Sequence, residues 1–147
     1  MSDLLPPAPP ETAPARVPVP YGHHLRPVRL ADGPLHRAAV EGSLRVLRDL
    51  HGTTRGWPPV TWSAEHSRRE LLRQVGEMER GTAWTYALLD ADETALLGCV
   101  RVEPAPDGAP TAWWWIVEEC LGTDLAAAVD ALVPHWLERN WSAASFR

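Results

Sequence analysis

Three apolar segments joined by short connectors constrain the fold of this chain more than any other feature. They run from Ala83 to Leu89, from Ala95 to Glu103 and from Thr111 to Val117, and each has the length and composition of a β-strand. The connectors, DADET and PAPDGAP, are too short for the crossover that two parallel neighbours need. We therefore expect these strands to form an antiparallel meander.

Helical segments lie on both sides of this meander in the sequence. Residues 31–52 carry apolar side chains at helical spacing and predict a helical region, interrupted at Gly42. A second helix is expected to begin at its cap Ser63 and to end at Gly81. An alanine-rich helix follows the third strand, near residue 125. The order of elements predicts an α+β fold, with helices on both faces of a mostly antiparallel mixed sheet.

The N-terminal segment differs from the rest in its proline content. Its first twenty residues hold seven of the fifteen prolines and no apolar pattern that could bury a face. We therefore predict a disordered tail over residues 1–22 and a single domain over residues 23–147. The domain is expected to start with a short strand from Leu25 to Leu30, and Pro27 would suit the edge of a sheet.

Composition excludes several classes of function. A net charge of −5 speaks against nonspecific nucleic-acid binding, which depends on neutralising phosphates. No apolar run reaches the length of a membrane span and no signal peptide is recognisable, so we expect a cytoplasmic protein that does not enter membranes. Cys99 and Cys120 lie in apolar segments and are interpreted as packed thiols. The six histidines show no ligand spacing, so no metal site is expected.

The junction after the third strand carries the most chemical information. The sequence WWWIVEECLGTDLAAAV runs from an aromatic strand through a turn at Gly122 into a helix. The first amides of a helix are unpaired and its N-terminus is positive, so such a turn can bind an anion. It can equally do no more than reverse the chain.

This junction, together with the strand ALLGCVRVEP and the order of elements, resembles the GNAT superfamily of acyl-CoA-dependent N-acyltransferases. The resemblance covers roughly Leu25 to Trp141. It implies acetyl-CoA as the acyl donor and an amine of a small molecule or protein as the acceptor. It also implies that the last strands and helix of the family are missing from a domain that stops at Arg147.

The resemblance further implies a set of coenzyme contacts. The family motif Arg/Gln-x-x-Gly-x-Gly/Ala falls on Leu121 to Ala126, and the main-chain amides of Ile116 and Val117 would polarise the thioester carbonyl. The expected cofactor-binding residues are Ile116, Val117, Leu121, Gly122, Thr123, Asp124 and Ala126. Leu121 departs from the motif because it is apolar. Asp124 departs from it because its carboxylate would cap the helix or repel a phosphate.

Catalytic and acceptor residues are implied in the same way. Glu118 or Glu119 would act as the general base, although both could instead be solvated acids near a helix start. Trp57, Trp62 and Trp114 are candidates for the acceptor pocket, and their alternative role is to cover or fill the core. The tyrosine that often protonates the leaving thiolate in this family has no counterpart.

Two other interpretations stay open. The chain could be a non-catalytic GNAT-like module in which Asp124 is a structural cap, or a truncated and inactive product of an acyltransferase gene. An open strand edge near residues 142–147 suggests pairing into a homodimer.

Overall fold

The computed structural model of the chain describes residues 15–51, 59, 61–104 and 110–140. Its strands are β1 (Val17–Val19), β2 (His23–Pro27), β3 (Trp84–Leu89), β4 (Leu96–Pro104) and β5 (Pro110–Ile116). Its α-helices are α1 (Gly33–Glu41), α2 (Leu44–His51), α3 (Ala64–Arg80) and α4 (Asp124–Asn140). Single turns of 3-10 helix are η2 (Pro20–Gly22), η3 (Leu30–Asp32) and η4 (Glu118–Cys120). Trp57 and the segment 142–147, where a dimer edge was predicted, lie outside the described residues.

The five strands form one sheet in the order β1-β2-β3-β4-β5. Each neighbouring pair is antiparallel, which confirms the predicted meander and the α+β class. Within the described residues no parallel pair occurs, so the mixed character that was expected is not seen there. The register places Thr85 opposite Arg101, and Arg101 opposite Trp113.

The prediction for the N-terminal segment is wrong at its boundary. Val17 and Val19 form β1, pair with β2 and are buried against the rest of the core. Alternation of apolar and exposed residues over only three positions was too short a signal beside so many prolines. Because β1 pairs with β2, the strand that contains Pro27 is internal and is not the edge strand that Pro27 was expected to suit. Pro27 is tolerated because it is the last residue of β2.

The predicted helix boundaries are confirmed. Ser63 caps α3, since its hydroxyl accepts a hydrogen bond of 3.2 Å from the His66 amide. Gly81 ends α3 in the left-handed region at φ 73°, where a side chain would be strained. The helical region near Gly42 divides into α1 and α2 as expected.

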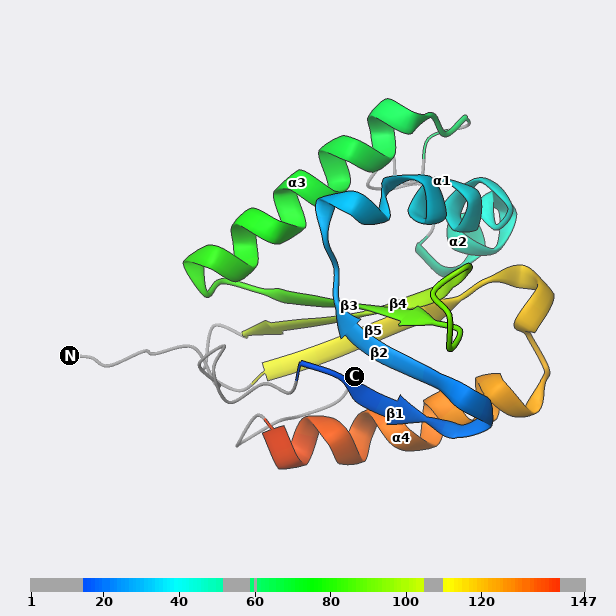
Figure 1. Ribbon diagram of the computed structural model, residues 1–147, viewed down its shortest axis with the longest axis vertical. Coiled ribbons are helices and arrows are strands. Elements are labelled where there is room, and N and C mark those ends of the chain that lie inside the picture. Colours follow the sequence, from blue (N-terminus) through cyan, green and yellow to red (C-terminus); the bar gives the residue numbers. More distant parts are fainter. Residues whose placement is uncertain (1–14, 52–58, 60, 105–109, 141–147) are drawn as a thin grey trace.

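The sheet lies between two helical layers (Figure 1): α4 covers one face, and α1, α2 and α3 cover the other. On the α4 face, Tyr86 and Trp136 meet edge to face with ring centroids 4.8 Å apart. On the opposite face, Leu71 of α3 packs in a cluster with Ala87 and Trp115 of the sheet. Strand alternation assigns successive β5 side chains to different layers.

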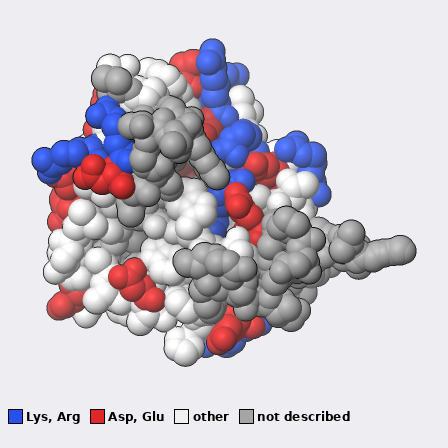
Figure 2. Space-filling model, turned by 180° about the vertical axis from the view of Figure 1, so that it is seen from behind, with Lys and Arg blue, Asp and Glu red and all other residues white. Residues whose placement is uncertain are grey.

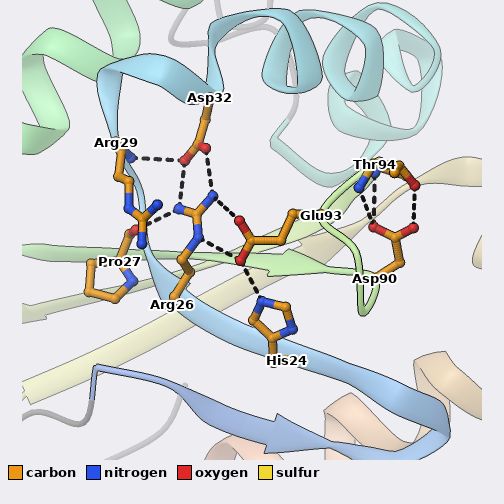
Figure 3. Close-up of polar contacts among 9 residues, drawn as sticks. His24, Arg26, Pro27, Arg29, Asp32, Asp90, Glu93 and Thr94 are labelled. Atoms are coloured by element: carbon orange, nitrogen blue, oxygen red, sulfur yellow. Dashed lines mark hydrogen bonds and ion pairs between the residues drawn. The ribbon is translucent and has the colours of Figure 1, made fainter.

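A buried ionic cluster ties the first strands to the start of α1 (Figure 3). Arg26 binds Asp32 at 2.7 Å and Glu93 at 3.0 Å, and Glu93 also binds the His24 ring at 2.7 Å. The hydrogen bond from Arg26 is the main cause that lowers the pKa of Glu93 to about 2. Glu93 itself has a positive φ of 57°, a backbone conformation that costs energy outside glycine. The cluster therefore holds the β3–β4 turn in place.

Candidate active site

The turn between β5 and α4 has backbone donors without a partner among the described residues. The amides of Cys120, Leu121 and Thr123 donate to carbonyls inside the turn. The Ala126 amide donates to the Thr123 hydroxyl at 3.4 Å. No acceptor within the described residues is found for the amides of Gly122, Asp124 and Leu125. These three donors lie at the positive end of α4, where an anion is favoured.

Asp124 does not occupy these amides. It is the first residue of α4, its side chain is exposed, and it makes no hydrogen bond to the described residues. The cap is Thr123, whose hydroxyl donates to the Cys120 carbonyl and accepts from Ala126. Gly122 has φ 74°, so the turn needs glycine at that position. Leu121 is exposed and supplies no charge.

The two predicted thioester amides point in different directions. The Val117 amide donates to the Leu97 carbonyl at 2.8 Å, so it is used within the sheet. Alternate residues of an antiparallel ladder direct their amides to opposite sides. The Ile116 amide therefore points to the side of β5 away from β4, where no described strand pairs with it. Of the two predicted residues, only Ile116 offers an outward donor.

A glycine on β4 maintains this arrangement. A Cβ atom at Gly98 would lie 2.3 Å from the Trp115 carbonyl oxygen and 3.2 Å from the Ile116 Cα. Both atoms belong to the backbone, so no side-chain rotation could relieve the clash. Gly98 therefore permits the close approach of β4 and β5 beside the Ile116 amide.

The predicted acids line a small cavity of about 190 Å³ beside α1 and the β3–β4 turn. Glu118 accepts a hydrogen bond of 2.9 Å from Arg45, and its amide donates to the Ser43 hydroxyl at 3.1 Å. Glu119 is exposed. The structure thus brings both glutamates to the strand end next to Ile116, and it pairs one of them with a cation.

A larger cavity of about 360 Å³ lies between α3 and the sheet. Its buried lining includes Gln74, Thr85, Cys99 and Trp115, whereas Trp113 is partly exposed. Burial raises the pKa of the Cys99 thiol, which confirms the interpretation of a packed thiol there. No residue of α3 was named as a site candidate from the sequence, so Gln74 was missed. The available signal was its spacing from Ser67, Leu71 and Met78, which places it on the apolar stripe.

Two tryptophans that were predicted to line the acceptor pocket lie elsewhere. Trp62 is buried and donates to the Ser67 hydroxyl at 2.7 Å. Trp114 faces α4 and donates to Asp130 at 2.8 Å. Alternation along β5 turns Trp113 and Trp115, rather than Trp114, toward α3. The third candidate, Trp57, is outside the described residues.

A chain of ion pairs forms one wall of the larger cavity. Arg73 binds Glu70 at 2.7 Å and Glu77 at 2.9 Å, while Arg101 binds Glu77 at 2.8 Å and also Glu103. Burial acts to raise the pKa of Glu77, but hydrogen bonds and charge from the two arginines lower it overall. Figure 2 shows basic and acidic residues side by side over the upper part of the view, whereas the lower left is largely uncharged.

Histidine chemistry in this cavity is limited by burial, which lowers the pKa of His36 to about 4. Its Nδ1 lies 2.8 Å from the Ser67 oxygen, which also accepts from Trp62. The His36 ring is neutral near pH 7, and its tautomer decides whether Ser67 donates to it or accepts from it. The described residues contain no group of three metal-ligating side chains, and none of their helices has the length and apolar character of a membrane span.

Comparison with known proteins identifies the fold. No family model matches the sequence, and no curated protein matches it. Among solved structures, RimL, a ribosomal L7/L12 alpha-N-protein acetyltransferase, matches in complex with coenzyme A with a TM-score of 0.67 and 20% identity over 89% of this chain and 72% of RimL. Apo RimL matches with a TM-score of 0.65 and 20% identity over 84% of this chain, which spans 65% of the RimL chain.

Two further matches have different titles. Mycobacterium smegmatis RimJ in complex with CoA-disulfide gives a TM-score of 0.56 and 18% identity over 85% of this chain and 61% of RimJ. FdhC, described as a nucleotide-linked sugar GNAT, gives 0.56 and 17% over 83% of this chain and 64% of FdhC. The chain therefore has the α+β fold of GNAT acetyltransferases.

Proposed function

We propose that this protein is an acyl-CoA-dependent N-acyltransferase, with acetyl-CoA as the simplest donor and an amine of a small molecule or protein as the acceptor. The observation that carries the proposal is the position of the outward Ile116 amide directly before a turn with three open amides. The likeness to acetyltransferase structures, including two that hold coenzyme A or its disulfide, supports it.

The residues of the turn fit the anionic part of coenzyme A. The amides of Gly122, Asp124 and Leu125 would hold the pyrophosphate, because they have no other acceptor among the described residues. Thr123 and Ala126 would shape the turn through their capping bond rather than contact the phosphate. The exposed Asp124 carboxylate weakens the fit by repulsion, which solvent screens.

Transfer of an acyl group from a thioester to an amine requires few protein groups. The amine nitrogen forms a bond to the acyl carbon, the carbon–sulfur bond breaks, and one proton leaves the nitrogen while the sulfur departs as a thiol. The Ile116 amide would stabilise negative charge on the carbonyl oxygen. Glu119, which has no ion pair among the described residues, is a better candidate than Glu118 for accepting the proton. Positioning the two reactants supplies much of the acceleration.

Calorimetric titration with coenzyme A tests the proposal, together with thiol release from acetyl-CoA over a panel of amines. We expect Asp124→Asn to tighten coenzyme binding about twofold to fivefold, the range for an exposed charge. Glu138→Gln removes an exposed acid from the other end of α4 and serves as the matched control. If neither the native protein nor Asp124→Asn binds coenzyme A at millimolar concentration, the proposal is wrong.

A non-catalytic GNAT-like module is the second candidate, and the turn itself favours it. No basic side chain lies between Glu118 and Ala126, and Asp124 adds a negative charge there. For such a module we expect no coenzyme binding in any variant and no thiol release.

A further inference from the structure

The larger cavity has an exposed rim and a buried floor. Glu103, Arg73 and Trp113 lie at the rim, with 43%, 47% and 37% of their surfaces exposed. Gln74 and Thr85 form the floor and are only 6% and 2% exposed. A guest that enters from solvent would therefore meet two buried polar side chains.

Both floor residues have a polar atom without a partner among the described residues. These atoms are Gln74 Oε1 and Thr85 Oγ1. The Gln74 amide is held in one orientation, because its Nε2 donates to Glu70 at 3.1 Å. Its oxygen is left as an acceptor. Buried groups of this kind are normally satisfied, and water or a guest that donates hydrogen bonds would satisfy these two atoms.

The net negative charge of the cavity wall favours a cationic guest. Three carboxylates, Glu70, Glu77 and Glu103, share two guanidinium groups, Arg73 and Arg101. One negative charge is uncompensated within this chain of ion pairs. Trp113 and Trp115 also line the cavity, and aromatic rings attract cations.

Three residues with hydrogen-bond acceptors line this cavity. Gln74 Oε1, Thr85 Oγ1 and the carboxylate of Glu70 match the three donors of an alkylammonium group. A carboxylate or phosphate guest would meet two acceptors at the floor, Gln74 Oε1 and the Glu70 carboxylate, while the guanidinium groups of Arg73 and Arg101 in the wall already bind carboxylates. A neutral alcohol would leave the surplus charge of the wall unpaired.

The floor is far from the Ile116 amide. Thr85 lies two strands from β5, or roughly 10 Å at the usual strand spacing. Its register position on β5 is Trp113, three residues before Ile116, which adds roughly 10 Å along the strand. An amine held at the floor is therefore roughly 14 Å from the proposed acyl site, too far to be the amine that reacts.

We propose that this cavity binds the distal ammonium group of an aliphatic chain that carries ammonium groups at both ends. The second amine reaches the Ile116 amide and is the acyl acceptor, a step that rests on the proposed function. The anchoring of the first ammonium does not depend on it.

Calorimetric titration of the full chain with diaminooctane, in the absence of any acyl donor, tests the anchor. Octanediol, in which hydroxyls replace both ammonium groups, is the control ligand. We expect binding of the diamine and binding of the diol at least about tenfold weaker. We expect Thr85→Val to weaken diamine binding about tenfold and Thr85→Ser, which keeps the hydroxyl, to restore most of it. Thr61→Val, on the exposed surface, is the matched control and should bind like the native protein.

Equal binding of diamine and diol, or unchanged binding by Thr85→Val, overturns the proposal. The acyl-transfer assay separates it from the proposed function. If diaminooctane binds but no amine of the panel is acylated, the anchor stands and the acyltransferase proposal fails. If other amines are acylated and diaminooctane does not bind, the reverse holds.

Discussion

Replacing Thr85 by valine should stabilise the unliganded protein while it weakens diamine binding. The Thr85 hydroxyl is buried and has no partner among the described residues. Valine has nearly the same shape and is also β-branched, so the packing of β3 is kept. The change removes the cost of an orphaned hydroxyl and adds no cavity.

The size of the effect follows from the surroundings of the hydroxyl. An unsatisfied buried polar group costs about 1–3 kcal/mol. Thr85 lines a cavity of about 360 Å³, which has room for water, and water recovers part of that cost. We therefore take the lower end and expect a gain of about 1 kcal/mol in the free energy of unfolding, or about 2–4 °C in Tm for a chain of this size.

Urea denaturation measures this gain, with an unchanged slope as the sign that the folded and unfolded states keep their compactness. Thr61→Val should stay within about 0.5 kcal/mol of the native protein. A loss of 1 kcal/mol or more for Thr85→Val would show that the hydroxyl has a partner in the folded protein. The reasoning about the cavity floor would then be refuted.

Two other variants test the frame of the site. Gly98→Ala places a Cβ 2.3 Å from the Trp115 carbonyl oxygen, so we expect a loss of about 1–3 kcal/mol in urea denaturation; an unchanged midpoint would contradict the close approach of β4 and β5. Glu93 has a pKa of about 2 against an ordinary 4.5, so the stability it contributes is complete above pH 4.5 and is lost as the pH falls toward 2. Glu93→Gln should lack this loss when the urea midpoint is followed from pH 5 to pH 2, and parallel curves for the two proteins would refute the assignment.

Much of the fold could be predicted because its signals are local. Connector length alone indicates the antiparallel meander, and Ser63 and Gly81 mark the ends of α3 through their own backbone chemistry. The strand at Val17–Val19 could not be predicted in this way, because its burial depends on two other elements. One of them, α4, is distant in the sequence, and the pairing with β2 is too short to give a recognisable pattern.

The sequence names the residues of the candidate site but not their geometry. The turn at Gly122 and the residues around it follow from the motif. Whether Asp124 or Thr123 caps the helix depends on the residue at which α4 begins, and a shift of one position would exchange their roles. Alternation shows that Trp114 differs from its neighbours, but only the packing of α3 and α4 shows which face lies toward a cavity.

The register of β5 against β4 decides two features of the candidate site together: which side chains enter the cavity and which amides point away from β4. Odd-numbered β5 residues place Trp113 and Trp115 in the cavity, and the even-numbered Ile116 directs its amide outward. A slip of one residue would turn Trp114 into the cavity and exchange the Ile116 amide for that of Val117 in the same movement. The proposed acyl and acceptor positions can therefore not be adjusted separately along this strand, and if the proposal holds, variation in specificity comes from α3 and from side-chain size.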